Sequence, residues 1–129
     1  MNKNMKKQRP VNLDLKTIKF PIAAIASILQ RVSGVMNIFF MALILRLLDI
    51  SLSSPEGFLK IRILMNHILF KMIMWLVSTI MIFHIIGGIR HILMDIGFFI
   101  KNEQYGARSA QIVFIFTTIL SIITGVFIW

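Results

Sequence analysis

Long runs without a charged residue divide this chain into apolar segments. The charge-free runs are Val32–Leu45, Met72–Ile89 (eighteen residues) and Ser109–Trp129 (twenty-one residues). A helix needs roughly 20 apolar residues to cross a bilayer, so the second and third runs qualify directly. The first run reaches that length if its flanking arginines extend to the interface or face protein. The pattern predicts three membrane-spanning helices, at about Ile22–Ser51, Ile63–Asp95 and Ala110–Trp129.

Turn-forming residues separate these expected helices. Ser51–Gly57, with the sequence Ser-Leu-Ser-Ser-Pro-Glu-Gly, is predicted as the first loop. Gly97–Arg108 is predicted as the second loop. Pro21 suits the first turn of the first helix, where its missing N–H does no harm. The sequence therefore predicts an all-α membrane domain over residues 22–129.

The composition agrees with a membrane protein and excludes several classes of function. Of the 129 residues, 57% are hydrophobic and only 15% are charged, and the mean hydropathy is +0.84. A soluble core of this length could not bury so much apolar surface, which argues against an ordinary cytosolic enzyme. The chain has no cysteine, so it holds no disulfide, thiolate nucleophile or iron–sulfur cluster of its own. With this hydropathy, the net charge of +9 indicates a charged membrane surface and no nucleic acid.

Much of the positive charge lies at the N-terminus. Six of the fourteen basic residues fall in the first twenty positions, and only Asp14 opposes them. By the positive-inside rule, this basic tail, residues 1–21, is expected in the cytoplasm. Three spans then place the C-terminus on the periplasmic side.

Polar residues inside the second expected helix form one stripe. His84, Gly88, His91 and Asp95 follow at spacings of four, three and four residues. A neutral imidazole deep in the span, beside the small Gly87, is what an axial haem ligand requires. The alternative is a buried histidine bonded to a neighbouring serine or carbonyl.

Charged groups follow His84 toward the membrane surface. Arg90 and His91 could pair with haem propionates through charge-assisted hydrogen bonds, or serve as interfacial anchors. Asp95 is a hypothetical proton-path or water-ordering residue. Its alternative is a helix-end carboxylate paired with Arg90 or Lys101.

A second cluster lies at the cytoplasmic end of the first expected helix. Ser27, Arg31 and Gly34 share one face, at spacings of four and three. The returning second helix brings its Arg90–Asp95 end to the same depth. A hydroxyl and a guanidinium at the membrane edge suit a polar quinone ring whose tail stays in lipid. The alternatives are a positive-inside anchor for Arg31 and helix packing for Ser27 and Ser33.

Other polar residues have simpler interpretations. His67 is expected near the opposite membrane surface, and Arg46 and Asp49 are expected to form an interfacial ion pair. The hydroxyls of the third helix are expected to bond back to helical carbonyls or to join this helix to another: Thr117, Thr118, Ser121 and Thr124.

The two clusters resemble a known family, the cytochrome b556 anchor subunits of succinate dehydrogenase. The second cluster matches as His84, three residues, then Gly88-Ile-Arg90-His91-Ile-Leu-Met-Asp95-Ile-Gly97. The first matches through Ser27-Ile-Leu-Gln30-Arg31-Val-Ser33, with Arg9-Pro10 in the tail. Ser53-Ser54-Pro55-Glu56-Gly57 matches in the first loop, so the resemblance covers nearly the whole chain.

The resemblance implies a haem and quinone site. The chain would be half of a heterodimeric haem-binding helical bundle, with His84 as one axial ligand of haem b and the second from the partner subunit. Ser27 and Arg31 match ubiquinone-site positions, and Arg31 and His91 match positions close to the haem propionates. The family usually has histidine where this chain has Gln30, which weakens any propionate or proton role at that position.

The resemblance also implies partners and a pathway. They are a second small anchor subunit, an iron–sulfur subunit that delivers electrons, and a flavoprotein subunit, in the bacterial inner membrane. This chain would have no catalytic activity by itself but would serve the tricarboxylic acid cycle and aerobic respiration. Together with this chain these subunits would form a heterotetramer, and the resemblance leaves open whether heterotetramers associate into a higher oligomer. The alternatives are the anchor of a quinol:fumarate reductase and, more remotely, a non-redox scaffold.

Overall fold

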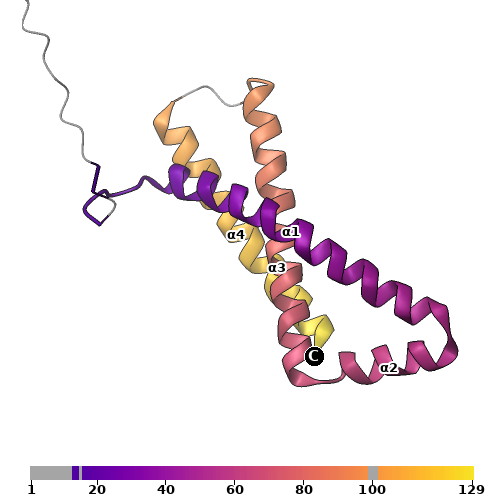
Figure 1. Ribbon diagram of the computed structural model, residues 1–129. Coiled ribbons are helices and arrows are strands. Elements are labelled where there is room, and N and C mark those ends of the chain that lie inside the picture. The colour runs from indigo at the N-terminus through magenta and orange to yellow at the C-terminus, as the bar shows by residue number, and fades with distance from the viewer. Residues whose placement is uncertain (1–12, 15, 99–101) are drawn as a thin grey trace, which may run out of the picture.

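The structure is a computed structural model that describes residues 13, 14, 16–98 and 102–129. In that part of the chain all regular structure is α-helical (Figure 1). The helices are α1 (Ile22–Ser53), α2 (Pro55–Met65), α3 (Ile68–Asp95) and α4 (Glu103–Ile128). This confirms the predicted all-α class.

α3 and α4 form the most extensive helix pair, and α1 crosses them. Figure 1 shows α3 and α4 running in opposite directions, with the N-terminal half of α1 passing across both. The C-terminal half of α1 diverges from the pair, and α2 returns from its end to the start of α3. Gln30 and Ser33, which contact α3, lie on this N-terminal half of α1.

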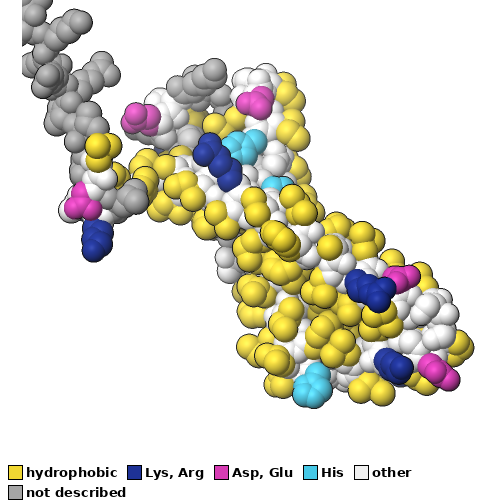
Figure 2. Space-filling view, viewed as in Figure 1, with side chains coloured by type: hydrophobic (Ala, Val, Ile, Leu, Met, Phe, Trp, Pro, Cys, Tyr) yellow, Lys and Arg dark blue, Asp and Glu magenta, His cyan; other side chains and the backbone are white. Residues whose placement is uncertain are grey.

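Burial in this chain is reversed relative to a soluble protein. The buried apolar residues are few and small or medium in size, namely Ala26, Val77, Ala110 and Val113. Among the described residues, five polar or charged ones are buried between the helices, while large apolar side chains cover the outside (Figure 2). Ile38 and Phe39, for example, are each 71% exposed. Such a surface requires lipid or partner helices around it.

Three of the helices, α1, α3 and α4, are long and apolar enough to cross a membrane. This agrees with the three spans predicted from the charge-free runs. Pro21 lies immediately before α1 instead of inside its first turn, and its carbonyl accepts from Ala24 N at 2.9 Å.

The predicted first loop is wrong, because most of it is helical. α1 continues to Ser53, and α2 begins at Pro55, so Ser54 alone separates the two helices. Ser54 is the N-cap of α2, and its hydroxyl accepts from Gly57 N at 2.9 Å. The Ser-Pro-Glu sequence, interpreted as a turn, is an N-cap followed by proline at the first helical position. The expected second helix is accordingly divided at Asn66 and His67, and α3 begins at Ile68 instead of Ile63.

α4, which corresponds to the third predicted helix, begins earlier than predicted. α3 ends as expected at Asp95, where Phe98 N bonds Leu93 O and Gly97 N bonds Met94 O, with φ +81° at Gly97. α4 then starts at Glu103, seven residues before the expected start at Ala110. Its first turns are polar, so hydropathy marked the apolar part of the helix and missed the remainder.

Candidate functional site

The candidate site lies where α1 crosses α3. Gln30 and Ser33, about one turn apart on α1, both reach His84 on α3. The Gln30 amide Nε2 donates to the backbone carbonyl of His84 at 2.8 Å. The Ser33 hydroxyl lies 3.0 Å from Nδ1 of the His84 ring. The crossing therefore joins the two polar clusters that the sequence placed on separate helices.

Two glycines make room for this crossing. A Cβ at Gly34 would lie 3.0 Å from Cε1 and 3.9 Å from Nε2 of His84. A Cβ at Gly87 would overlap the Gln30 side chain, coming within 2.8 Å of its Cδ. Small residues at a helix crossing let the other helix approach closely. Gly34 thus lets α1 pack closely against the Cε1 edge of the imidazole ring, and Gly87 leaves space for the amide.

The Gly87→Ala substitution is expected to loosen the α1–α3 crossing. The added methyl group must displace the Gln30 amide, and overpacking of this kind costs about 1–3 kcal/mol. The thermal unfolding midpoint of the purified protein in detergent should fall. Gly88→Ala is the matched control, because a Cβ there comes no closer than 3.8 Å to Gln30. Equal effects of the two substitutions would contradict this assignment of Gly87.

The two ring nitrogens of His84 have different surroundings. Nδ1 lies against Ser33 and Gln30, at 3.0 and 3.3 Å. No hydrogen bond joins Nε2 to any residue that the structure describes. A neutral imidazole with one unpartnered ring nitrogen can bind a metal ion or a haem iron.

His84 is not part of a cluster of metal ligands in the described part of the chain. Within residues 16–98 and 102–129, no three His, Cys, Asp or Glu side chains are grouped to hold a metal ion. The arrangement therefore suits one axial ligand to a haem, and it does not suit a metal site made by this chain alone. The unpartnered Nε2, with Nδ1 held by α1, fits that role.

Gln30 has one unsatisfied atom at the site. Its Oε1 is buried without a hydrogen-bond partner in the described part of the chain. An orphaned buried acceptor costs about 1–3 kcal/mol, so a donor outside this chain would stabilise the site.

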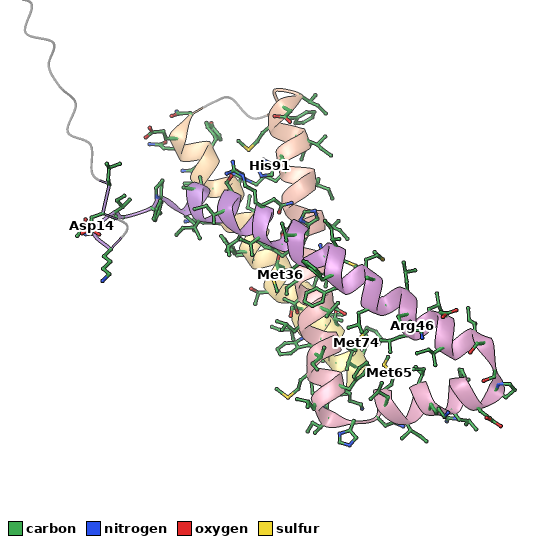
Figure 3. All side chains as sticks on the ribbon, in the orientation of Figure 1. Asp14, Met36, Arg46, Met65, Met74 and His91 are labelled. Carbon is green, nitrogen blue, oxygen red and sulfur yellow. The ribbon has the colours of Figure 1, made fainter. Side chains whose placement is uncertain are left out.

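The other residues of the His84 stripe lie toward the end of α3. His91 is half-buried and Asp95 is exposed. Figure 3 labels His91 on the part of α3 that follows the crossing. Asp95 forms no ion pair with Arg90, which removes one of its two expected partners; Lys101 lies outside the described residues.

Arg90 faces α4, away from His84. Only 7% of it is exposed, and its Nε donates to Ser109 Oγ at 2.9 Å while Nη2 donates to the Gly106 carbonyl at 3.2 Å. The interpretation of Arg90 as an interfacial anchor or propionate ligand is therefore replaced by a structural one. It ties α3 to the first turns of α4, a role that hydrophobic periodicity gave no means to detect.

Ser27 and Arg31 lie on α1 beside the crossing. Ser27 is half-buried and Arg31 is exposed. Arg31 makes no hydrogen bond within the part of the chain that the structure describes, and neither does the Ser27 side chain. Both polar groups therefore remain available to a ligand or to a partner chain.

Sequence reasoning missed the contribution of Ser33. It treated the Ser33 hydroxyl as helix packing, yet Ser33 is 4% exposed and contacts the His84 ring. The available signal was its position three residues after Gln30, on the same face of α1.

The expectations for the Arg46–Asp49 pair and for three of the four α4 hydroxyls are met. The expectation for Thr117 is wrong, because its Oγ1 is buried without a hydrogen-bond partner in the described part of the chain. Arg46 and Asp49 form an exposed ion pair at 2.9 Å. Thr118 and Thr124 donate to the carbonyls of Phe114 and Leu120 on their own helix. The Ser121 hydroxyl instead joins α4 to α3, because it bonds Thr79 at 2.7 Å.

The comparison with protein families covers nearly the whole chain. The model for the succinate dehydrogenase/fumarate reductase transmembrane subunit matches residues 5–124, which include α1, α2, α3 and the crossing. The chain belongs to this family.

Individual relatives agree with the family assignment. The chain is 37% identical over 126 residues to a succinate dehydrogenase cytochrome b556 subunit of Coxiella burnetii, covering 97% of this chain and 100% of that one. It is 28% identical over 120 residues to the cytochrome b556 subunit of Paracoccus denitrificans, covering 90% and 88%. It is 30% identical over 129 residues to a succinate dehydrogenase cytochrome b560 subunit of Reclinomonas americana, covering 93% and 89%.

Family membership confirms the resemblance found in the sequence motifs. With three helices of spanning length, the chain is a multi-pass membrane protein of the succinate dehydrogenase/fumarate reductase family. Its relatives are named as subunits of an oxidoreductase complex and as b-type cytochromes.

Proposed function

We propose that this chain is a membrane-anchor subunit of succinate dehydrogenase that binds haem b together with a second anchor subunit. The observation that supports this best is the His84 imidazole, whose Nδ1 lies against Ser33 and Gln30 of α1 while Nε2 has no hydrogen-bond partner among the described residues. Haem supplies a one-electron redox centre when bound. His84 would provide one axial nitrogen, and the partner subunit the other.

Charged side chains near the crossing would complete the haem site. Arg31 and His91 are the residues we assign to the haem propionates, on the two helices that meet at Gln30 and His84. Charge-assisted hydrogen bonds from guanidinium or imidazolium groups to carboxylates are among the stronger polar contacts in proteins. Arg90 is left out because its guanidinium is committed to α4.

Ser27 and Arg31 would form part of the ubiquinone-reduction site. The Arg31 side chain is exposed, and the Ser27 hydroxyl and the guanidinium share one face of α1. Hydrogen bonds from these donors would orient the quinone ring by its carbonyl oxygens while the isoprenoid tail remains in lipid. Asp95 is exposed at the C-terminal end of α3, where it would order water or carry protons to the quinone.

The remaining assignments follow from the charge pattern and the family. The N-terminal tail, residues 1–21, would face the cytoplasm, and residues 22–129 would form the domain in the inner membrane, with the C-terminus periplasmic. Electrons would come from succinate through the flavoprotein and iron–sulfur subunits, since this chain has no cysteine to hold a cluster.

The second candidate function is anchor subunit of a quinol:fumarate reductase, which runs the reaction in the opposite direction. It is kept because the family's description includes both enzymes. The names of the relatives favour succinate dehydrogenase. Purification through an affinity tag on this chain tests the assignment. A flavoprotein, an iron–sulfur protein and a second small membrane subunit should co-purify, with succinate-dependent quinone reduction faster than quinol-dependent fumarate reduction. Recovery of the chain without a flavoprotein would contradict the proposal.

A further inference from the structure

The Nδ1 atom of His84 has two polar neighbours, both on α1. Ser33 Oγ lies at 3.0 Å and Gln30 Nε2 at 3.3 Å. Ser33 is only 4% exposed, and its hydroxyl also donates to the Gln30 backbone carbonyl at 2.8 Å. The ring, the hydroxyl and the carbonyl thus form a short chain of hydrogen-bonding groups between α3 and α1.

The chemistry of these groups fixes the direction in which hydrogen bonds are donated along this series. If Nε2 binds iron, Nε2 must be free of hydrogen, and the proton of the neutral ring then lies on Nδ1. The amide nitrogen of Gln30 is a donor only, so it cannot accept that hydrogen. The Ser33 hydroxyl can accept it, because its own hydrogen already points to the Gln30 carbonyl. The sequence of bonds is Nδ1–H to Ser33 Oγ, and Ser33 O–H to Gln30 O.

We infer that Ser33 is a positioning residue that fixes the tautomer and rotation of His84 for iron ligation; this inference rests on the proposed haem function. A ligating histidine commonly donates its other ring N–H to an acceptor, which orients the ring and raises its basicity. A more basic axial imidazole stabilises the oxidised iron. Ser33 therefore holds the haem midpoint potential lower than it would be without the hydroxyl.

Gln30 acts on a different part of the same histidine. Its amide donates at 2.8 Å to the backbone carbonyl of His84, so it holds α3 against α1 without accepting from the ring. The two neighbours therefore have separable effects. Loss of the Gln30 side chain weakens the helix crossing, whereas loss of the Ser33 hydroxyl changes the electronic character of the ligand.

The test is a redox titration of the haem in the intact complex carrying Ser33→Ala. The midpoint potential should rise, and the low-spin ferric signal in electron paramagnetic resonance should shift its g-values. Metal binding should weaken by about ten-fold or more, seen as a lower haem-to-flavin ratio after detergent washing. Ser33→Thr retains a hydroxyl and should keep the wild-type midpoint potential. Ser78→Ala is the matched control, since the Ser78 hydroxyl donates only to Met74 O on its own helix.

The possible outcomes distinguish failure of the Ser33 positioning role from failure of the proposed haem ligation by His84. A Ser33→Ala complex with the wild-type midpoint potential and g-values overturns the positioning role while leaving His84 as the ligand. If Ser33→Ala takes up no haem, uptake by Ser33→Thr at the wild-type potential supports the role, and failure of both contradicts it. A complex carrying His84→Ala whose haem spectrum and haem content match the wild type contradicts the proposed function itself.

Discussion

His84→Ala is expected to remove the b-type haem spectrum from the purified complex. This substitution deletes an imidazole whose Nδ1 is held by α1 and whose Nε2 has no hydrogen-bond partner among the described residues. Reduced-minus-oxidised spectra of the complex, normalised to flavin, should lose the α-band.

His67→Ala provides the matched control for that experiment. His67 is an exposed residue immediately before α3, seventeen positions from His84, and it makes no side-chain cap bond. Its replacement should leave the haem spectrum and the haem-to-flavin ratio unchanged. Loss of haem in both variants would indicate failed assembly, and retention in both would exclude His84 as the ligand.

Arg31→Leu is expected to impair quinone reduction by about 10-fold or more. Hydrogen bonds to a charged group contribute about 1.5–3 kcal/mol, and each 1.36 kcal/mol of lost transition-state stabilisation lowers the rate tenfold. Arg31 is exposed on α1 and is not engaged by other described residues, so its loss should not disturb the fold. Succinate-dependent reduction of ubiquinone should fall, while reduction of an artificial dye by the soluble subunits should continue.

Arg46→Leu is the corresponding control on the same helix. Arg46 is exposed and pairs with Asp49 at 2.9 Å, fifteen positions from Arg31, and such surface ion pairs contribute little to stability. Its quinone-reductase activity should match the wild type. Parallel loss of dye and quinone reduction in Arg31→Leu would show failed assembly and would contradict a local role in the quinone site.

Hydropathy and charge predicted the helices better than their boundaries. The charge-free runs located all three long helices, because the cost of placing a charge in lipid excludes charges from spans. The same signal could not find α2, where Glu56, Lys60 and Arg62 interrupt the apolar residues, or the polar first turns of α4. At Ser54 the residues that resemble a turn are also those that cap a helix, and only the backbone distinguishes the two.

The candidate site was predictable on each helix but not across the helices. The i, i+3 and i, i+4 spacings correctly placed His84, His91 and Asp95 on one face of α3. The pairing of Gln30 and Ser33 with His84 depends on the crossing point of α1, which no periodicity specifies. The Arg90 contact with Ser109 likewise required the packing of α4 on α3.

The central claim is that His84 ligates the haem iron, and the most direct measurement is the spectrum and midpoint potential of a His84→Met complex. Methionine in place of histidine as an axial ligand raises the potential of a haem. The account predicts a changed low-spin spectrum with a raised midpoint potential, or loss of the haem when the thioether cannot reach the iron. A His84→Met complex with the wild-type spectrum and midpoint potential would contradict it.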